Sequence, residues 1–464
     1  MNTAKKFYHD ASRIAFDEAH RKKIDFNMSR YDLAVEKGMK RYRDVEAAKN
    51  QAAAIKREVL NHLDEYLLQF EKNITSHGVE VFWARNSEEA IAYVEKILVE
   101  NEARLLVKSK SMTTEEIELN AAVAKLDCES VETDLGEFIV QTAGEKPYHI
   151  VTPAMHKSKS EIADLFHDKF GTPPESTPEE LSDFVRRLLR KKFTQAQIGV
   201  TGANFLIADI GGISVTENEG NALMSTSFPK IHLVFAGIEK IIPKMEQLGL
   251  FYPLLAVHGT GQQVTAYNTI FTGPRQTGEI DGPEKMYVIL LDNGRIGIFA
   301  DDEAYESLAC IRCGACLNGC PVYRTIGGYT YNATYSGPIG SAISPFLKGF
   351  RDFYHLSYAS TLCGKCAEVC PVKIPLTDIF LANRRKAVEQ QLSPAAEKAA
   401  MKGFRLIASK RKGFDFFPAV MKNSAFYPLN YWGWGPKRAV PKFAKKSFSQ
   451  LYRKQNKQNK QNIN

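Results

Sequence analysis

The first 70 residues carry the apolar spacing of amphipathic helices. Between Val59 and Phe70, apolar side chains recur three or four positions apart, and the whole stretch contains almost no glycine or proline. Residues at this spacing fall on one face of a helix, which can pack against a neighbour. Basic and acidic residues share the other positions, as on a solvated helix face, and no nucleic-acid-binding motif accompanies them. We therefore predict a helical N-terminal region and no nucleic-acid partner.

A different pattern follows from about residue 72 to residue 300, where short apolar runs alternate with helical stretches. Runs of buried-strand type lie at 79–84, 104–110, 129–134, 149–154, 205–218, 231–238 and 286–300. Helical patterns lie at 113–126, 134–144 and 177–197. A further helix is predicted after Asn86, because Glu89 stands three residues on, as in a capping box. Strands that alternate with helices predict an α/β domain with a largely parallel sheet.

Seven of the eight cysteines lie within residues 310–371, in two runs that each end in Cys-Pro. The runs consist of Cys310, Cys313, Cys316, Cys320 and Pro321, and of Cys363, Cys366, Cys370 and Pro371. This is the spacing of bacterial two-cluster ferredoxins, in which the last cysteine of a run ligates the other cluster. The spacing therefore predicts two [4Fe–4S] clusters.

The exchange of the last cysteines predicts two ligand sets. Cluster one takes Cys310, Cys313, Cys316 and Cys370, and cluster two takes Cys320, Cys363 and Cys366. Cluster two is one thiolate short, because Ser360 stands where the second run would begin. Ser360 or Thr361 supplies an alkoxide, or a ligand comes from elsewhere in the chain or from a partner subunit, or the site holds a [3Fe–4S] cluster. We favour a four-iron cluster with one labile corner.

Disulfides and zinc are the other common roles of clustered cysteines. The N-terminal segment lacks the apolar stretch of a secretory signal, and cytosolic thiols stay reduced. Zinc sites use two CxxC pairs or add histidine, whereas the closest histidine to either run is His355. The isolated Cys128 is predicted to be a buried small hydrophobe, with a cluster ligand or a redox thiol as the alternative.

Glu217 and Glu219 are the candidates for acid–base or covalent chemistry. They follow a predicted strand and stand beside Gly220, and open α/β sheets bind ligands at the carboxyl ends of their strands. The alternative is that the two carboxylates cap a helix or face solvent. No GxGxxG or Walker A motif is present, so we predict no bound nucleotide.

A long insert, residues 321–362, separates the two cysteine runs and is rich in glycine, tyrosine, serine and proline. It is predicted to cover the clusters, since burial and hydrogen bonds to sulfur set their potential. Arg312, Lys365 and Lys373 stand close to the cysteines. They either raise the cluster potential or dock an acidic partner, unless they are simply solvated charges.

The net charge of +8 comes from the C-terminal end of the chain. Residues 436–464 contain nine lysines and arginines and no acid, so the rest of the chain is near neutral. We predict a disordered basic tail that contacts an acidic membrane surface or a partner subunit, or that has no specific contact. No apolar run approaches the roughly 18 residues of a membrane span. We predict a cytoplasmic protein, with the inner face of the membrane as a second possible place.

The whole chain resembles the L-lactate utilization protein B family. The resemblance is carried by the helical start, the α/β region, the runs CIRCGACLNGCPVYR and SYASTLCGKCAEVCPVKIPL, the segment YSGPIG and the tryptophan-rich end. The cysteine runs alone are shared by many redox proteins, and their combination with YSGPIG and the α/β region is specific. The family also has a serine at the position of Ser360.

The resemblance implies a fold, partners and a role. The α/β part is expected to be similar to the NagB/RpiA/CoA-transferase-like fold, and Glu217-Asn218 is loosely similar to a glutamate motif of CoA transferases. The partners would be companion lactate utilization proteins, one a cysteine-rich cluster-binding subunit and one a lone LUD-domain subunit. The implied role is electron transfer during the oxidation of L-lactate to pyruvate. The expected domains are a helical region, an α/β LUD-type domain, a two-cluster ferredoxin-type domain and a helical region with the basic tail, at 1–71, 72–300, 301–385 and 386–464.

Three functions are compatible with the sequence, and the electron-transfer role is the first of them. The first function is an electron-transfer subunit without complete activity alone, which leaves the substrate chemistry to a partner because no flavin motif is visible. The second is an oxidoreductase subunit whose α/β domain binds the organic substrate directly and passes electrons to the clusters. The third is a domain that handles CoA or a phosphosugar and carries regulatory clusters.

Overall fold

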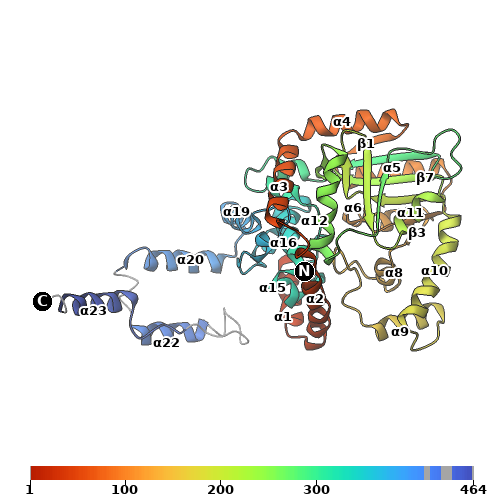
Figure 1. Ribbon diagram of the computed structural model, residues 1–464. Coiled ribbons are helices and arrows are strands. Elements are labelled where there is room, and N and C mark those ends of the chain that lie inside the picture. The colour runs from red at the N-terminus through yellow and green to blue at the C-terminus, as the bar shows by residue number, and fades with distance from the viewer. Residues whose placement is uncertain (1, 412–417, 430–441, 462–464) are drawn as a thin grey trace. The chain divides into compact units, whose positions relative to one another are not determined.

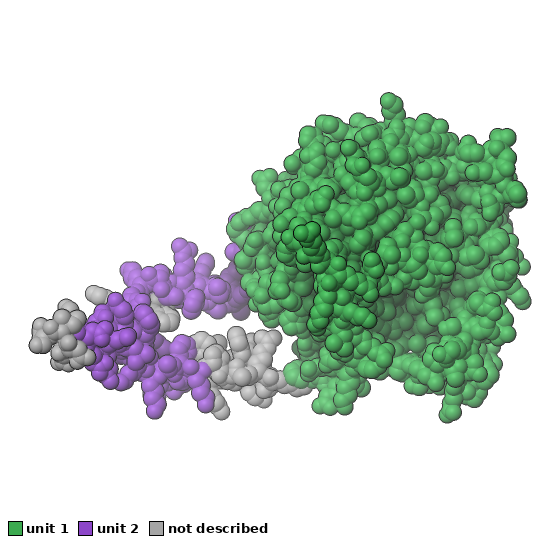
Figure 2. Space-filling model, viewed as in Figure 1, with its two compact units in different colours: residues 1–387 green, residues 388–464 purple. Residues whose placement is uncertain are grey.

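The computed structural model describes residues 2–411, 418–429 and 442–461 (Figure 1). The chain divides into two units, Met1–Ala387 and Val388–Asn464, which Figure 2 colours separately. The larger unit contains both the α/β region and the two cysteine runs, so these parts of the sequence belong to one packed body.

The N-terminal region is helical, as its apolar pattern predicts. Its helices are α1 (Thr3–Ile14), α2 (Glu18–Met39), α3 (Val45–Asn61) and α4 (Leu63–Ser76). The side chains of Asn2, Asp17 and Asp44 accept backbone N–H groups at the starts of α1, α2 and α3, which satisfies donors that a helix end leaves free. The apolar stripe that includes Val59 and Phe70 is buried.

The centre of the larger unit is a six-stranded sheet with the order β1-β10-β7-β4-β2-β3, in which every adjacent pair is parallel. The strands are β1 (Glu80–Ala84), β2 (Leu105–Lys108), β3 (Glu129–Glu132), β4 (Ile198–Gly202), β7 (Ile231–Gly237) and β10 (Lys285–Leu291). Alternate residues of β10 face opposite sides: Ile289 packs with helix α5 (Ser87–Glu100), and Val288 packs with α4. The predicted parallel sheet is confirmed, and both of its faces are covered.

A second sheet has the order β8-β5-β6-β9. Its strands are β5 (Phe205–Ile207), β6 (Gly212–Glu217), β8 (Ile241–Ile242) and β9 (Tyr267–Phe271). The run 205–218 therefore does not join the parallel sheet, because it folds back at Gly211 into the antiparallel pair β5–β6. Gly211 has a φ of 60°, and a Cβ there would meet the backbone of Ile74. Only glycine combines this left-handed turn with so close an approach.

Helices surround the sheets. Besides α5 they are α8 (Leu135–Thr142), α9 (Lys159–Phe170), α10 (Pro178–Gln195), α11 (Asn221–Ser227), α12 (Leu248–Thr260) and α13 (Arg295–Phe299), with the 3-10 helices η1 (Ile238–Lys240) and η2 (Met245–Gln247). The cap predicted at Asn86 is confirmed, since its side chain accepts the N–H of Glu89 at 2.9 Å. The carboxylate of Glu89 accepts the N–H of Arg85, so the second bond of a capping box is not made to Asn86.

Three further predicted elements differ from the structure. The run 286–300 is a strand only as far as Leu291, and its last residues form α13. The helix expected over 113–126 is divided into α6 (Met112–Glu116) and α7 (Leu119–Ala124), because Glu118 between them has a left-handed φ of 55°. The strand expected at 149–154 is wrong. That segment turns on itself, with the N–H of Tyr148 bonded to the carbonyl of Pro153, and it contains a proline that cannot donate to a sheet.

The cysteine-rich region is built from short helices. They are η3 (Tyr305–Ala309), α14 (Ala315–Asn318), α15 (Pro321–Ile326), η4 (Tyr329–Tyr331), α16 (Gly337–Leu347), α17 (Phe350–Phe353), η5 (Tyr354–Tyr358), α18 (Lys365–Glu368) and α19 (Leu376–Glu389). The insert between the cysteine runs packs inward: Tyr323 and Tyr331 are fully buried in the same apolar cluster as Cys313 and Cys370. The insert thus covers the cysteines, as predicted.

The smaller unit contains the helices α20 (Ala395–Ala408), α22 (Ala419–Leu429) and α23 (Phe448–Gln461). The prediction of a disordered tail is wrong for α23. Its sequence is rich in lysine and glutamine, which favour helices, and Ser447 and Gln450 exchange capping hydrogen bonds at its start. Across the described ranges 2–411, 418–429 and 442–461, no helix is both long and apolar enough to span a membrane.

The contact between β4 and α11 leads to a first prediction. Gly199 of β4 lies against α11, and a Cβ at this position would collide with the carbonyl oxygen of Ser225. We expect Gly199→Ala to lower the free energy of unfolding by about 1–3 kcal/mol, because a backbone contact cannot give way as a side chain does. Urea denaturation measures the loss. Gly297→Ala is the control, since its Cβ meets open space, and an equal effect of both substitutions would contradict the prediction.

Candidate iron–sulfur site

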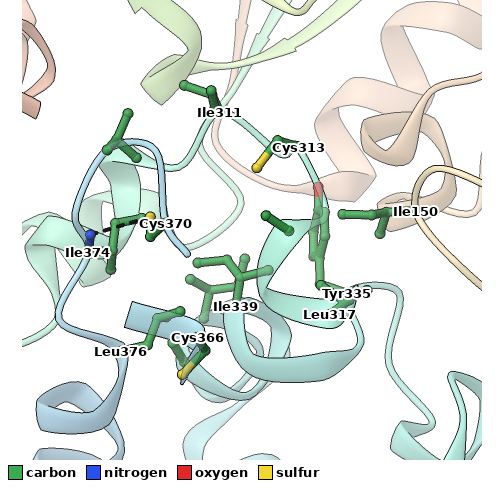
Figure 3. Packing of buried hydrophobic residues seen from close by; sticks show 14 of the residues in the cluster. Ile150, Ile311, Cys313, Leu317, Tyr335, Ile339, Cys366, Cys370, Ile374 and Leu376 are labelled. Carbon is green, nitrogen blue, oxygen red and sulfur yellow. Dashed lines mark hydrogen bonds between the residues drawn. The ribbon is translucent and has the colours of Figure 1, made fainter. Parts of the chain in front are cut away.

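Cysteines from two distant segments line one small cavity, which we call cavity one. They are Cys310, Cys313, Cys316 and Cys370. Gly314, with a left-handed φ of 83°, turns the chain into α14, which carries Cys316. Apolar side chains that include Ile339 and Ile374 complete the wall (Figure 3). Cavity one is therefore a thiol-lined space within an apolar core.

The remaining cysteines of the two runs line a second space, cavity two. They are Cys320, Cys363 and Cys366. Ser360 and Thr361 lie in the same wall. The Ser360 hydroxyl accepts the N–H of Leu362 at 3.1 Å, and the Ser360 carbonyl accepts a bond from Arg384 of α19 at 3.2 Å. Ser360, which stands where a cysteine would complete the second run, thus has its hydroxyl group in the wall of cavity two.

Each run contributes its last cysteine to the cavity of the other run. Cys320 follows α14 but lines cavity two, and Cys370 follows α18 but lines cavity one. Helices α14 and α18 pack against each other, which brings the two cavities close together. This is the grouping that the spacing of the cysteines predicts, whereas their role as ligands stays a prediction.

Backbone groups point at some of the sulfur atoms. The N–H groups of Arg312 and Ile374 lie 3.4 Å from the Sγ atoms of Cys310 and Cys370, and the second of these bonds is drawn in Figure 3. The N–H of Tyr323 lies 3.5 Å from the Sγ of Cys320. Hydrogen bonds of this kind stabilise the ionised form of a thiol.

Burial acts in the opposite direction on most of these thiols. It raises the pKa of Cys366 and Cys370 to about 11, and it raises the pKa of Cys313 and Cys316 as well. Cys363 is exposed, and the backbone N–H of Lys365 lowers its pKa. Buried thiols of this basicity need a strongly cationic partner to ionise. The donor set fits the iron of an iron–sulfur cluster.

The cysteines are all free thiols. Among the described residues, no three His, Cys, Asp or Glu side chains stand close enough to share one metal ion. The seven cysteines of the two runs line two cavities instead, and each cavity has cysteines from both runs. Cys128 is 3% exposed and packs with Leu106 and Val123 beside the parallel sheet, as expected for a small buried hydrophobe.

A buried chain of ion pairs joins the end of the parallel sheet to cavity one. Glu239, directly after β7, pairs with Arg295 at 2.6 Å and with Arg312 at 3.1 Å. Arg295 also pairs with Glu116 at 2.9 Å. Burial favours the neutral acid, but the charges of Arg295 and Arg312 outweigh it and lower the pKa of Glu239 to about 2. The ionised Glu239 holds Arg312 next to Cys310.

Sequence reasoning missed Glu239 and the adjacent Lys240. Their signal was two charges inside the apolar run 231–242, since buried charges require partners or a function. Arg312 was singled out, but its side chain is only 10% exposed and pairs with Glu239. A role for Arg312 in docking an acidic partner is therefore excluded, whereas an effect on the potential of cluster one stays a prediction.

A third cavity, cavity three, lies between the sheets and the cysteine-rich region and has a volume of about 300 Å³. Its wall contains both predicted acids, Glu217 and Glu219, together with Lys240, Arg312 and Cys313. The structure thus places the candidate acids in a cavity that one cysteine of cavity one also lines.

The contacts of the two acids differ. Glu217 accepts the N–H groups of Ala222 and Leu223 at 2.6 and 3.0 Å, so it caps α11, as one of the alternatives expected. Within the described part of the chain, Glu219 accepts a single long bond of 3.4 Å, from the N–H of Leu135. Burial raises the pKa of both carboxyl groups. Neither contact assigns a catalytic role.

Family models match both parts of the larger unit. The LUD domain model matches residues 67–291, and the 4Fe-4S dicluster domain model matches residues 306–374. The second match supports iron–sulfur cofactors in the region that contains both cysteine-lined cavities. The chain is thus a mixed α/β protein with a parallel sheet and a dicluster domain.

Relatives match most of the chain. Lactate utilization protein B of Geobacillus thermodenitrificans is 45% identical over 82% of this chain and 79% of its own length. The protein of the same name from Shouchella clausii is 42% identical over 88% of both chains. A crystal structure of a DUF162 family protein from Deinococcus radiodurans matches 49% of this chain and 98% of its own at 15% identity, with a TM-score of 0.29, which is too low to support an argument. From the two relatives we conclude that the chain belongs to the lactate utilization protein B family.

Proposed function

We propose that this chain is an electron-transfer subunit in the oxidation of L-lactate to pyruvate. The observation that carries the proposal is the grouping of the motif cysteines into two neighbouring cavities within a dicluster domain. The name of its relatives supports lactate as the metabolite. Each cluster, when bound, would accept and release one electron.

The residues of the chain divide the work of holding the clusters. Cluster one is proposed to be held by Cys310, Cys313, Cys316 and Cys370, and cluster two by Cys320, Cys363 and Cys366. The apolar wall of cavity one keeps water from the first set, and the insert covers it. Cys363 is exposed, so an electron would enter or leave most readily on the side of cavity two.

The second candidate function is an oxidoreductase subunit whose α/β domain binds the organic substrate itself. Cavity three favours it, because Cys313 lines this cavity as well as cavity one. A substrate there would lie next to the proposed cluster one. The third function, with CoA or a phosphosugar as ligand, is not favoured by the same wall, which combines the acids Asp134, Glu217 and Glu219 with the cations Lys110, Lys240 and Arg312.

The other expectations stay predictions. The proposed partners are companion lactate utilization proteins, a cysteine-rich cluster-binding subunit and a lone LUD-domain subunit. The proposed location is the cytoplasm, with contact to the inner face of the membrane through the basic end of the chain. The all-parallel sheet is compatible with the NagB/RpiA/CoA-transferase-like fold that the family resemblance implies.

Iron content tests the proposal directly. Protein purified without oxygen is expected to contain about eight irons and about eight sulfides per chain, with an EPR signal of two interacting clusters after reduction. The clusters are expected to be reduced by L-lactate only when both companion proteins are present. About four irons per chain, or a chain whose clusters stay oxidised in the complete mixture, would overturn the proposed function.

Ser360 gives a prediction about the incomplete ligand set. Cluster two is proposed to have one labile corner, so Ser360→Ala is expected to leave the iron content near about eight without oxygen. After brief exposure to air, an EPR signal of an oxidised three-iron cluster is expected in both the variant and the unchanged chain. A variant that loses iron before any exposure would instead identify the serine oxygen as the fourth ligand. Thr361→Ala tests the other hydroxyl of the same wall, and loss of iron from that variant before exposure would identify Thr361 as the fourth ligand.

A further inference from the structure

Cavity three has a cationic end. Lys240 and Arg312 line it, and their side chains are at least nine-tenths buried. The charges that act most strongly on Lys240 are those of Arg312, Glu239 and Cys310. Those that act on Glu219 are Asp134, Lys110 and Glu217. The charges of the cavity therefore fall into two groups, a cationic end beside Cys313 and a second end where the acids Asp134, Glu217 and Glu219 outnumber the one cation Lys110.

The donors at the cationic end lack acceptors. The ammonium group of Lys240 has no hydrogen-bond or ion-pair partner among the described residues, although neighbouring lysines such as Lys244 pair with acids. Of the nitrogens of Arg312, Nη2 bonds to Glu239, whereas Nε and Nη1 are buried with no partner in the described part of the chain. Each of the two buried Arg312 nitrogens left without an acceptor costs about 1–3 kcal/mol. Such a cost is usual where a ligand supplies the missing acceptor.

The buried charges around this end are also unbalanced. The cations are Lys56, Lys240, Arg295 and Arg312, and the acids are Glu116 and Glu239. Burial lowers the pKa of Lys56 to about 7 and that of Lys240 to about 8, so Lys240 remains mostly charged at neutral pH. Thiolates in cavity one would offset the charge of Arg312, which lines both cavities. Lys240 lines cavity three and does not line cavity one, although the charge of Cys310 also acts on it.

We propose that cavity three binds a small monocarboxylic acid, with the carboxylate on Lys240 and Arg312. A volume of about 300 Å³ suits a small metabolite and lies at the lower limit for ligand pockets. The acids Asp134, Glu217 and Glu219 at the other end repel a second negative charge, which selects against phosphates and nucleotides. The same end can accept a hydrogen bond from the hydroxyl group of a 2-hydroxy acid.

The site deepens the second candidate function, in which the α/β domain binds the organic substrate, and it rests on the proposed function only for the choice of acids to test. A ligand on Lys240 would share the wall of cavity three with Cys313. The binding site is therefore placed beside cluster one and not at the exposed cavity two. No step of the chemistry is assigned to it.

Calorimetric titration of the cluster-loaded chain tests the site. The probes are L-lactate, pyruvate and the neutral analogue L-lactamide, which keeps the hydroxyl group and lacks the charge. We expect at least one acid to bind, at least tenfold tighter than lactamide, and to shift the EPR signal of the reduced chain. Lys240→Met is expected to weaken binding at least tenfold, and Lys244→Met, an exposed lysine outside the cavity, is expected to leave it unchanged.

The outcomes separate the site from the proposed function. Equal binding of acids and lactamide to the unchanged chain, or full affinity in Lys240→Met, would overturn the site even with about eight irons present. Acid binding by a chain with too little iron would support the site and contradict the electron-transfer role. Lys240→Met is expected to fold, because Lys240 leaves no partner behind and its loss removes repulsion from Arg312. The comparison of lactate with lactamide does not depend on this variant.

Discussion

Replacing Cys370 with alanine is expected to lower the iron content from about eight to about four or fewer per chain. Cys370 is the one cysteine of the second run that lines cavity one. Its loss removes the thiol that joins the two segments there and leaves the N–H of Ile374 without its sulfur acceptor. Since a site of this kind stabilises the fold that surrounds it, the variant is also expected to unfold at lower urea concentration.

Iron analysis and EPR of the reduced protein measure the first effect. Cys128→Ala is the matched control, because Cys128 is equally buried but packs beside the parallel sheet, away from both cavities. It is expected to keep all of its iron and to lose only the packing of one sulfur atom. Iron near the full content in Cys370→Ala would mean that cluster one is held by a different set of residues.

Replacing Glu239 with glutamine is expected to lower the free energy of unfolding by about 3–5 kcal/mol. The carboxylate of Glu239 is fully buried between Arg295 and Arg312. Without its charge, two buried guanidinium groups remain near each other, and only Glu116 is left to pair with Arg295. Removing the charge of one partner of a buried ion pair lowers the stability of the fold, because the remaining charge stays buried and cannot return to water.

Urea denaturation without oxygen measures this loss. Glu246→Gln is the control, since Glu246 is exposed and lies 3.9 Å from Lys244, and pairs of this kind contribute about 0–1 kcal/mol. Arg312 is also expected to move from its place beside Cys310, so the EPR signal of cluster one should change in Glu239→Gln. A variant as stable as the control would show that Arg295 and Arg312 find other partners.

The grouping of the cysteines could be predicted because their spacing is local. Two residues between successive thiols fix which side chains share a loop, and the last cysteine of each run indeed lines the other cavity. The helices of the first 70 residues could be predicted for the same reason, since their apolar stripe repeats with the period of a helix. In both cases the pattern that carries the prediction joins residues that are only about three or four positions apart in the sequence.

Features that depend on contacts between residues far apart in the sequence could not be predicted. The run 205–218 has the apolar character of one buried strand, and only the approach of Gly211 to Ile74 shows why it turns back. Arg312 and Glu239 are far apart in sequence, so the burial of Arg312 could not be read from its neighbours. The prediction for the C-terminal tail was wrong for a different reason. Its low complexity suggested disorder, but its lysine and glutamine residues also favour a helix, and they form α23.

The exchange of Cys320 and Cys370 between the two cavities has a consequence for assembly. Neither cavity has its full set of cysteines until residues 310–320 and 363–370 have met. The first cluster to form bears the entropy cost of closing the loop between the two cysteine runs. The second cluster then forms in a chain in which the two runs are already held together. Filling should therefore be cooperative during maturation, so that chains starved of iron divide into empty and full molecules, with few that are half-filled.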